Sequence, residues 1–62
     1  QDVPMDENVL MDYVKRFRLA DLQKQYLAHS RLAATYSRNG DARLAEELAA
    51  CKKINDEMKQ WS

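Results

Sequence analysis

The sequence lacks the residues on which most other protein classes depend. Its 62 residues include one cysteine, so no disulfide can form within the chain. One glycine and one proline exclude collagen-like segments and most all-β folds, because sandwiches and hairpins need turn residues every ~8–12 positions. No apolar run approaches the ~20 residues of a membrane-spanning helix. So short a chain also hides only ~60% of the surface of its unfolded form, too little for the deep site of most enzymes.

Charge is balanced overall but divided along the chain. Residues 1–14 carry four acids and no base, residues 15–38 carry six bases and one acid, and residues 41–62 carry five acids and four bases. A basic middle segment is able to approach a phosphate backbone. No aromatic residues are interleaved with a basic run, however, so a solvated helix face is the better interpretation. Direct nucleic-acid binding therefore ranks lowest among the functions considered.

The remaining alanine, leucine and charged residues predict an all-α fold, with a short N-terminal helix followed by a long antiparallel helical hairpin. Residues 2–5 read as a linker, and Asp6 is the expected N-cap of a first helix over about 7–17. The apolar row changes phase near residues 17–19, which favours a break before a second helix over about 19–38. Because no glycine or proline separates Phe17 from Leu19, one continuous helix is the alternative. Gly40 favours a left-handed helix end in a turn at 39–41, and Asp41 favours capping of a third helix over about 42–60.

The helical spacing also predicts which side chains face one another in the hairpin. Because two helices cannot cover both faces of their own core, we expect the first helix to pack across the open end. That packing places Leu10, Val14 and Phe17 near Leu22, Met58 and Trp61. The inner row of the second helix is expected to be Leu22, Tyr26, His29, Ala33 and Tyr36. The inner row of the third is expected to be Leu44, Leu48, Cys51, Asn55 and Met58, with Ala45, Ile54 and Trp61 alongside.

No group of residues predicts catalysis, a cofactor or a metal. His29 is the single histidine and has no acid at helical spacing, so a locally hydrogen-bonded histidine is favoured over a metal ligand. Cys51 has no activating base nearby in sequence and reads as a small core residue. Glu46 and Glu47 are adjacent, so their side chains diverge around the helix and are expected on its solvated face. The prediction is an interaction module with no catalytic site of its own.

Two known helical patterns share the hairpin's residues. Leu32, Ala33 and Tyr36, followed by Gly40-Asp41 and Ala45, resemble a tetratricopeptide repeat, but only one repeat fits in the chain. The order Val9-Leu10-x-x-Tyr13-Val14, Leu19-x-x-Leu22, Asn39-Gly40-Asp41, Ala45-x-x-Leu48 and Lys52-Lys53-Ile54 covers more of it. That order resembles the carboxyl-terminal helicase-binding region of bacterial DnaG-type replicative primases.

The primase resemblance implies a function, a partner and a location. The module would dock on the amino-terminal domains of the DnaB-type hexameric helicase and couple primer synthesis to the replication fork, making no primer itself. It would be the carboxyl-terminal piece of a larger cytoplasmic protein, a DNA primase with nucleotidyltransferase activity elsewhere in the chain. The alternative is a scaffold or adaptor hairpin, either a tetratricopeptide-like fragment or a self-associating coiled coil. A homo-oligomer of the isolated module is compatible with both.

The predicted partner-binding residues lie in two places on the hairpin. Tyrosine, arginine and tryptophan are the residue types that most often contribute strongly to binding energy at interfaces. They occur at the tip and on the last helix, which favours these two places. Trp61 has a second interpretation, in which it packs against the first helix instead of facing a partner. The residues predicted to bind the partner are Tyr36, Arg38 and Asn39 at the tip, and Ile54, Met58 and Trp61 along the last helix.

Overall fold

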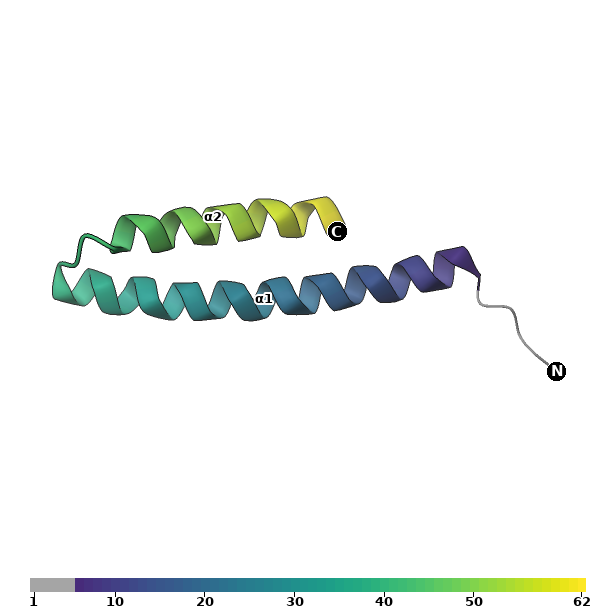
Figure 1. Cartoon of the computed structure of the whole chain (residues 1–62), viewed down its shortest axis with the longest axis horizontal. Helices are drawn as coiled ribbons and strands as arrows, with labels where there is room; N and C mark the ends of the chain where they lie inside the picture. The colour runs from purple at the N-terminus through teal and green to yellow at the C-terminus, as the bar shows by residue number, and fades with distance from the viewer. Residues whose placement is uncertain (1–5) are drawn as a thin grey trace.

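The computed structural model describes residues 6–62 as an antiparallel pair of helices (Figure 1). Helix α1 runs over Glu7–Asn39 and α2 over Leu44–Trp61, so the predicted all-α hairpin is confirmed. At ~1.5 Å per residue α1 is about 50 Å long and α2 about 27 Å. The amino-terminal part of α1 therefore extends beyond the end of α2 (Figure 1). The linker expected over residues 2–5 lies outside the described residues.

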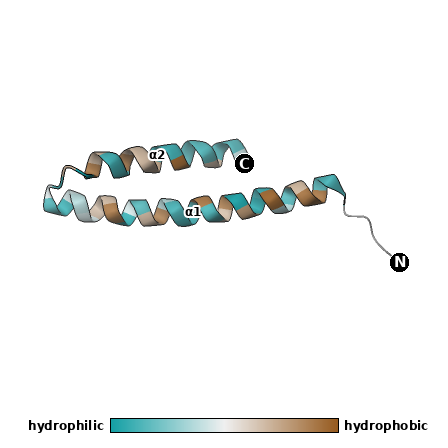
Figure 2. Ribbon diagram, in the orientation of Figure 1, coloured by the Kyte–Doolittle hydropathy of each residue, from teal (hydrophilic) through white to brown (hydrophobic). Residues whose placement is uncertain are grey.

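The predicted break near residues 17–19 is wrong, because α1 continues through it without interruption. The predicted helices at 7–17 and 19–38 are one helix. The apolar row nevertheless changes from one face of α1 to another at this point. Leu22 is 4% exposed against α2, whereas Phe17 is 80% exposed. Five residues turn a helix by about 140°, so the apolar row moves to another face of α1 while the backbone continues. Figure 2 shows hydrophobic residues along α1 past the end of α2.

The core is a single seam between the two helices. Its buried side chains are Leu22 and Ala33 of α1 and Ile54 of α2. The predicted inner row of α1 is largely confirmed, with His29 and Tyr36 half-buried beside Leu22 and Ala33 and Tyr26 at the margin of the seam. The inner row of α2 differs from the prediction at two positions, since Leu48 and Asn55 are exposed. Spacings of three and four residues link its actual members, which are Leu44, Glu47, Cys51, Ile54, Met58 and Trp61.

The start of α1 follows the sequence prediction. Asp6 is the N-cap, and its Oδ1 accepts a hydrogen bond of 3.2 Å from the backbone N–H of Asn8. That bond satisfies one of the amide groups that a helix leaves free in its first turn. One turn later, Arg16 and Asp12 form an exposed ion pair at 3.1 Å. Capping and charge thus stabilise the part of α1 that has no neighbouring helix.

Candidate functional site

The hairpin tip is a short turn fixed by backbone hydrogen bonds. Gly40 follows α1 in the left-handed conformation, with φ 63° and ψ 32°, as predicted. Its N–H donates to the carbonyl of Ser37 at 3.4 Å, and the N–H of Asp41 donates to the carbonyl of Tyr36 at 2.9 Å. These bonds satisfy carbonyls that the end of a helix otherwise leaves free. The chain therefore reverses over residues 40–43 before α2 begins.

Asp41 organises this turn through Arg43. Its Oδ1 accepts a hydrogen bond of 2.9 Å from the backbone N–H of Arg43, and its Oδ2 accepts one of 2.7 Å from Nη2 of the same arginine. The side-chain hydrogen bond, followed by the backbone one, lowers the pKa of Asp41 to about 2. The same side-chain bond raises the pKa of Arg43. Asp41 is not the N-cap of the next helix, as was predicted, because α2 begins at Leu44 and Arg43 occupies the N-cap position.

Arg43 also ties the turn to the end of α1. Its guanidinium carbon lies 4.6 Å from the centroid of the Tyr36 ring, within the range of a cation–π contact. We call Tyr36, Asp41 and Arg43 the tip cluster. Tyr36 is one of the predicted partner-binding residues, whereas Arg43 is not. The Asp-x-Arg spacing in a turn predicts this arrangement. It lets the carboxylate accept hydrogen bonds from both the backbone N–H and the guanidinium of the residue two positions later.

The six predicted partner-binding residues do not form one surface. Arg38 and Asn39 are exposed at the end of α1, next to the half-buried Tyr36 of the tip cluster. Ile54 is 6% exposed and belongs to the core, so it has no free side chain to offer a partner in the single hairpin. Met58 and Trp61 lie three residues apart at the opposite end of α2, roughly 20–26 Å from its start. The structure thus divides the other five residues into two groups, the three at the tip and the pair of Met58 and Trp61.

At the far end, Trp61 packs against α1. The ring lies 6.0 Å from the guanidinium carbon of Arg18, and it borders a hollow that four residues of α1 also line: Asn8, Met11, Asp12 and Lys15. Met58 and Trp61 are both half-buried. This geometry matches the packing interpretation of Trp61, with part of its ring still accessible.

A polar pair lies at the margin of the seam between the helices. His29 Nδ1 lies 2.5 Å from Oε2 of Glu47, and the side chains of His29 and Glu47 are 36% and 16% exposed. The hydrogen-bonded histidine was predicted, although its partner comes from the other helix. The placement of Glu47 on the solvated face is wrong. Its position one turn before Cys51 and two before Ile54 aligns it with the inner row of α2.

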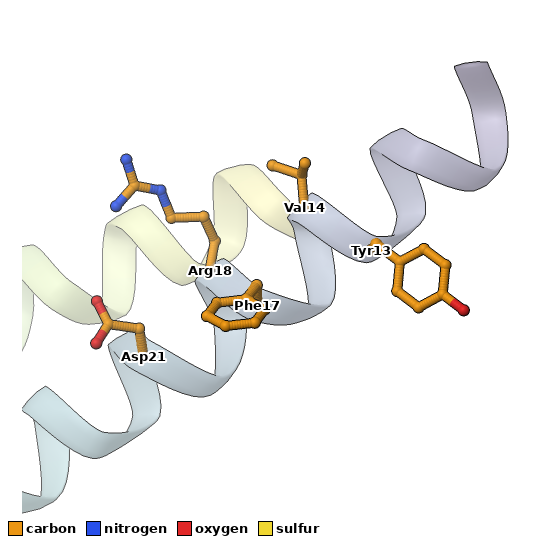
Figure 3. A pocket seen from close by; sticks show the side chains of 5 residues that line it. All are labelled: Tyr13, Val14, Phe17, Arg18 and Asp21. Carbon is orange, nitrogen blue, oxygen red and sulfur yellow. The ribbon is translucent and has the colours of Figure 1, made fainter. Parts of the chain in front are cut away.

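An apolar face lies on the free part of α1. Leu10 is 50%, Tyr13 60%, Val14 41% and Phe17 80% exposed. Figure 3 shows Tyr13 projecting away from α2, and Tyr13, Val14 and Phe17 border an open hollow together with Arg18 and Asp21. All five come from one helix. Because α1 is continuous, its first part does not fold across the open end of the hairpin as expected, and Phe17, which was expected near Leu22, Met58 and Trp61, is exposed instead.

Within residues 6–62, no three histidine, cysteine or acidic side chains gather closely enough to hold a metal ion. Cys51 is half-buried and free. Neither α1 nor α2, the helices of the described part of the chain, is long and apolar enough to cross a membrane. The polar chemistry that the structure does present is that of surface contacts: two guanidinium groups, a carboxamide, a carboxylate and one tyrosine ring at the tip.

Comparison with known proteins gives no relative to set beside these sites. No family model, no curated protein and no solved structure matches the chain.

Proposed function

We propose that the chain is a non-catalytic protein-docking module that binds its partner with the tip of the hairpin. The tip cluster carries this proposal, because hydrogen bonds and the contact between Arg43 and Tyr36 fix the turn before any partner arrives. A turn that is already ordered loses little conformational entropy on binding. Arg38 and Asn39 stand exposed beside it and supply the charged and polar contacts.

The proposed partner is the amino-terminal domain of the replicative DnaB-type helicase, and the support for it is the sequence resemblance. The residues that carry the resemblance to primases are spread over both helices, and one group of them lies at the tip: Asn39, Gly40 and Asp41 in the turn, then Ala45 and Leu48. Leu48 is 55% exposed, one turn into α2, and so adds an apolar contact to the polar tip. Apolar and arginine side chains together are typical of interface cores.

The alternative function is a scaffold hairpin. A tetratricopeptide repeat places two helices within about 34 residues. Here α1 alone takes up 33 residues, and α2 covers only part of its length. This departure in length ranks the repeat-fragment interpretation second. Self-association is a separate property that docking through the tip leaves possible.

Isothermal titration of the 62-residue chain into the helicase amino-terminal domain tests the proposed function. We expect saturable binding with a Kd of tens of micromolar or tighter, without nucleotide or nucleic acid. Arg38→Ala is expected to weaken it at least ~5-fold, a loss of about 1 kcal/mol. Arg31→Ala is the matched control, since this arginine is also exposed on α1 but lies about two turns before Arg38. Absence of heat at these concentrations, or equal losses in both variants, would contradict docking through the tip.

A further inference from the structure

We propose that the amino-terminal half of α1 binds a second copy of the chain, antiparallel, along one row of exposed residues on the side away from α2. The row is spaced four, three, four, three and four residues apart, the alternation that keeps side chains on one face of a supercoiled helix pair. Each member is exposed in the single hairpin. The row, called the α1 seam below, begins at the N-cap Asp6 and continues on α1 with Leu10, Tyr13, Phe17, Ala20 and Lys24.

The composition of the α1 seam makes it complementary to itself in one orientation. Its centre is apolar, with Tyr13 60% and Phe17 80% exposed, and its two ends carry Asp6 and Lys24. Antiparallel pairing places Asp6 of one copy beside Lys24 of the other, twice per dimer, and stacks Tyr13 on Phe17 of the second copy. Parallel pairing would place like charges together at both ends, which is destabilising. The charges therefore select the antiparallel dimer.

The fold leaves room for this pairing. Leu22, which faces α2, lies about 140° around α1 from Phe17. Helix α2 therefore lies well away from the α1 seam, and in the dimer the two α2 helices lie outside the α1 pair. The paired region ends at Lys24, fifteen residues before the end of α1 at Asn39. The two hairpin tips then point in opposite directions, and each stays free to dock.

A second copy fits this face better than an unrelated protein because acid and base occur in equal number at opposite ends of one row. An interface of about six residues per chain is smaller than a standard one of 20–30 residues a side. We therefore expect a weak dimer, with a Kd on the order of 10–100 µM, that forms at the concentrations of a structural experiment.

Sedimentation equilibrium of the full chain over about 5–500 µM tests the dimer. We expect the weight-average mass to rise from monomer to dimer across this range. Phe17→Glu should raise the Kd at least ~10-fold, because a carboxylate would be buried in the centre of the pairing. Leu48→Glu is the matched control, an exposed leucine off the α1 seam, and should leave the Kd unchanged. A wild-type monomer at every concentration, or a dimer unaffected by Phe17→Glu, would overturn the proposal.

The antiparallel orientation of the two chains in the dimer is tested by a separate measurement. A nitroxide on Gln23→Cys in a Cys51→Ser background is mixed with isotope-labelled wild-type chain. In the antiparallel dimer the label broadens amide signals near Asn8 of the second copy, whereas a parallel dimer places the broadening near Gln23. Broadening at Gln23 would overturn the antiparallel arrangement. Because Phe17 and the tip are far apart on α1, Phe17→Glu should leave helicase binding intact. The proposed dimer and the proposed docking through the tip are therefore tested separately, and one can be contradicted without the other.

Discussion

His29 and Glu47 meet across the hairpin at 2.5 Å, at the margin of a seam whose other inward side chains are mostly apolar. The two residues come from different helices and are eighteen positions apart in sequence. A polar pair between two helices favours one alignment of the helices, because sliding either helix by a turn would break the hydrogen bond and leave the largely buried carboxylate of Glu47 without its partner. The pair thus contributes specificity of alignment to the hairpin.

A double-mutant cycle tests whether His29 and Glu47 interact in solution. We expect His29→Ala and Glu47→Ala to be coupled by about 0.5–1.5 kcal/mol in urea unfolding, the usual net value of one hydrogen bond. The His29→Leu, Glu47→Leu double variant should be at least as stable as the wild type, since leucine suits both seam positions. A coupling near zero, or a strongly destabilised leucine pair, would mean that the contact does not form in solution.

Gly40 is predicted to be the least replaceable residue of the tip. No atom lies within 4 Å of the place that a Cβ would occupy, so the only obstacle to substitution is the positive φ. Gly40→Val should lower the free energy of unfolding by at least ~1 kcal/mol, because a β-branched residue rarely takes this conformation. Gly40→Asn is the control and should cost less, since asparagine tolerates it. Coincident thermal melts of valine variant and wild type would contradict the turn geometry.

Acid should weaken the tip through Asp41. The pKa of this carboxyl is about 2 in the folded chain against an ordinary value of 3.8. A carboxyl with a lowered folded pKa stabilises the fold above its unfolded pKa and loses that effect as pH falls towards the folded pKa. The stability of the wild type should therefore decline between about pH 4 and pH 2 more than that of Asp41→Asn. Parallel acid titrations followed by circular dichroism compare the two. Identical curves would show that the bond to Arg43 is absent in solution.

Ile54 and Phe17 should respond oppositely to truncation despite both being large and apolar. Ile54 is 6% and Phe17 80% exposed. Ile54→Ala should therefore cost about 2 kcal/mol or more, whereas Phe17→Ala should stay within about 0.5 kcal/mol in dilute, monomeric samples. Urea unfolding at low micromolar concentration measures both. A large cost at Phe17 alone would mean that the free part of α1 packs against the rest of the chain.

The sequence predicted the ends of the fold better than its middle. Capping at Asp6 and the reversal at Gly40 follow from local chemistry that no tertiary contact has to supply. The break near residue 17 was inferred from the phase of the apolar row alone. Phase reports which face is apolar, and a helix with different neighbours along its length changes face without bending. The absence of glycine and proline in α1 was the better guide to its continuity.

Glu47 and Leu48 show why the inner row of α2 was misplaced. Hydrophobicity favours Leu48 inside and Glu47 outside, whereas the structure has the reverse, with Leu48 55% exposed. The face of α2 that meets α1 carries positions 44, 47 and 51. His29 on the facing helix gives the inward carboxylate a partner. Only the pairing of the two helices, which a single sequence does not contain, determines this choice.

The most direct test of docking through the tip is a nitrogen–proton correlation spectrum of the labelled chain, recorded as unlabelled helicase amino-terminal domain is added. The account predicts that the largest changes fall on the amides of residues 36–43 and on Leu48, while those of Leu10 and Phe17 change least. A spectrum that does not change would contradict the proposed function. Changes confined to residues 10–17 would show instead that the partner occupies the apolar face of α1.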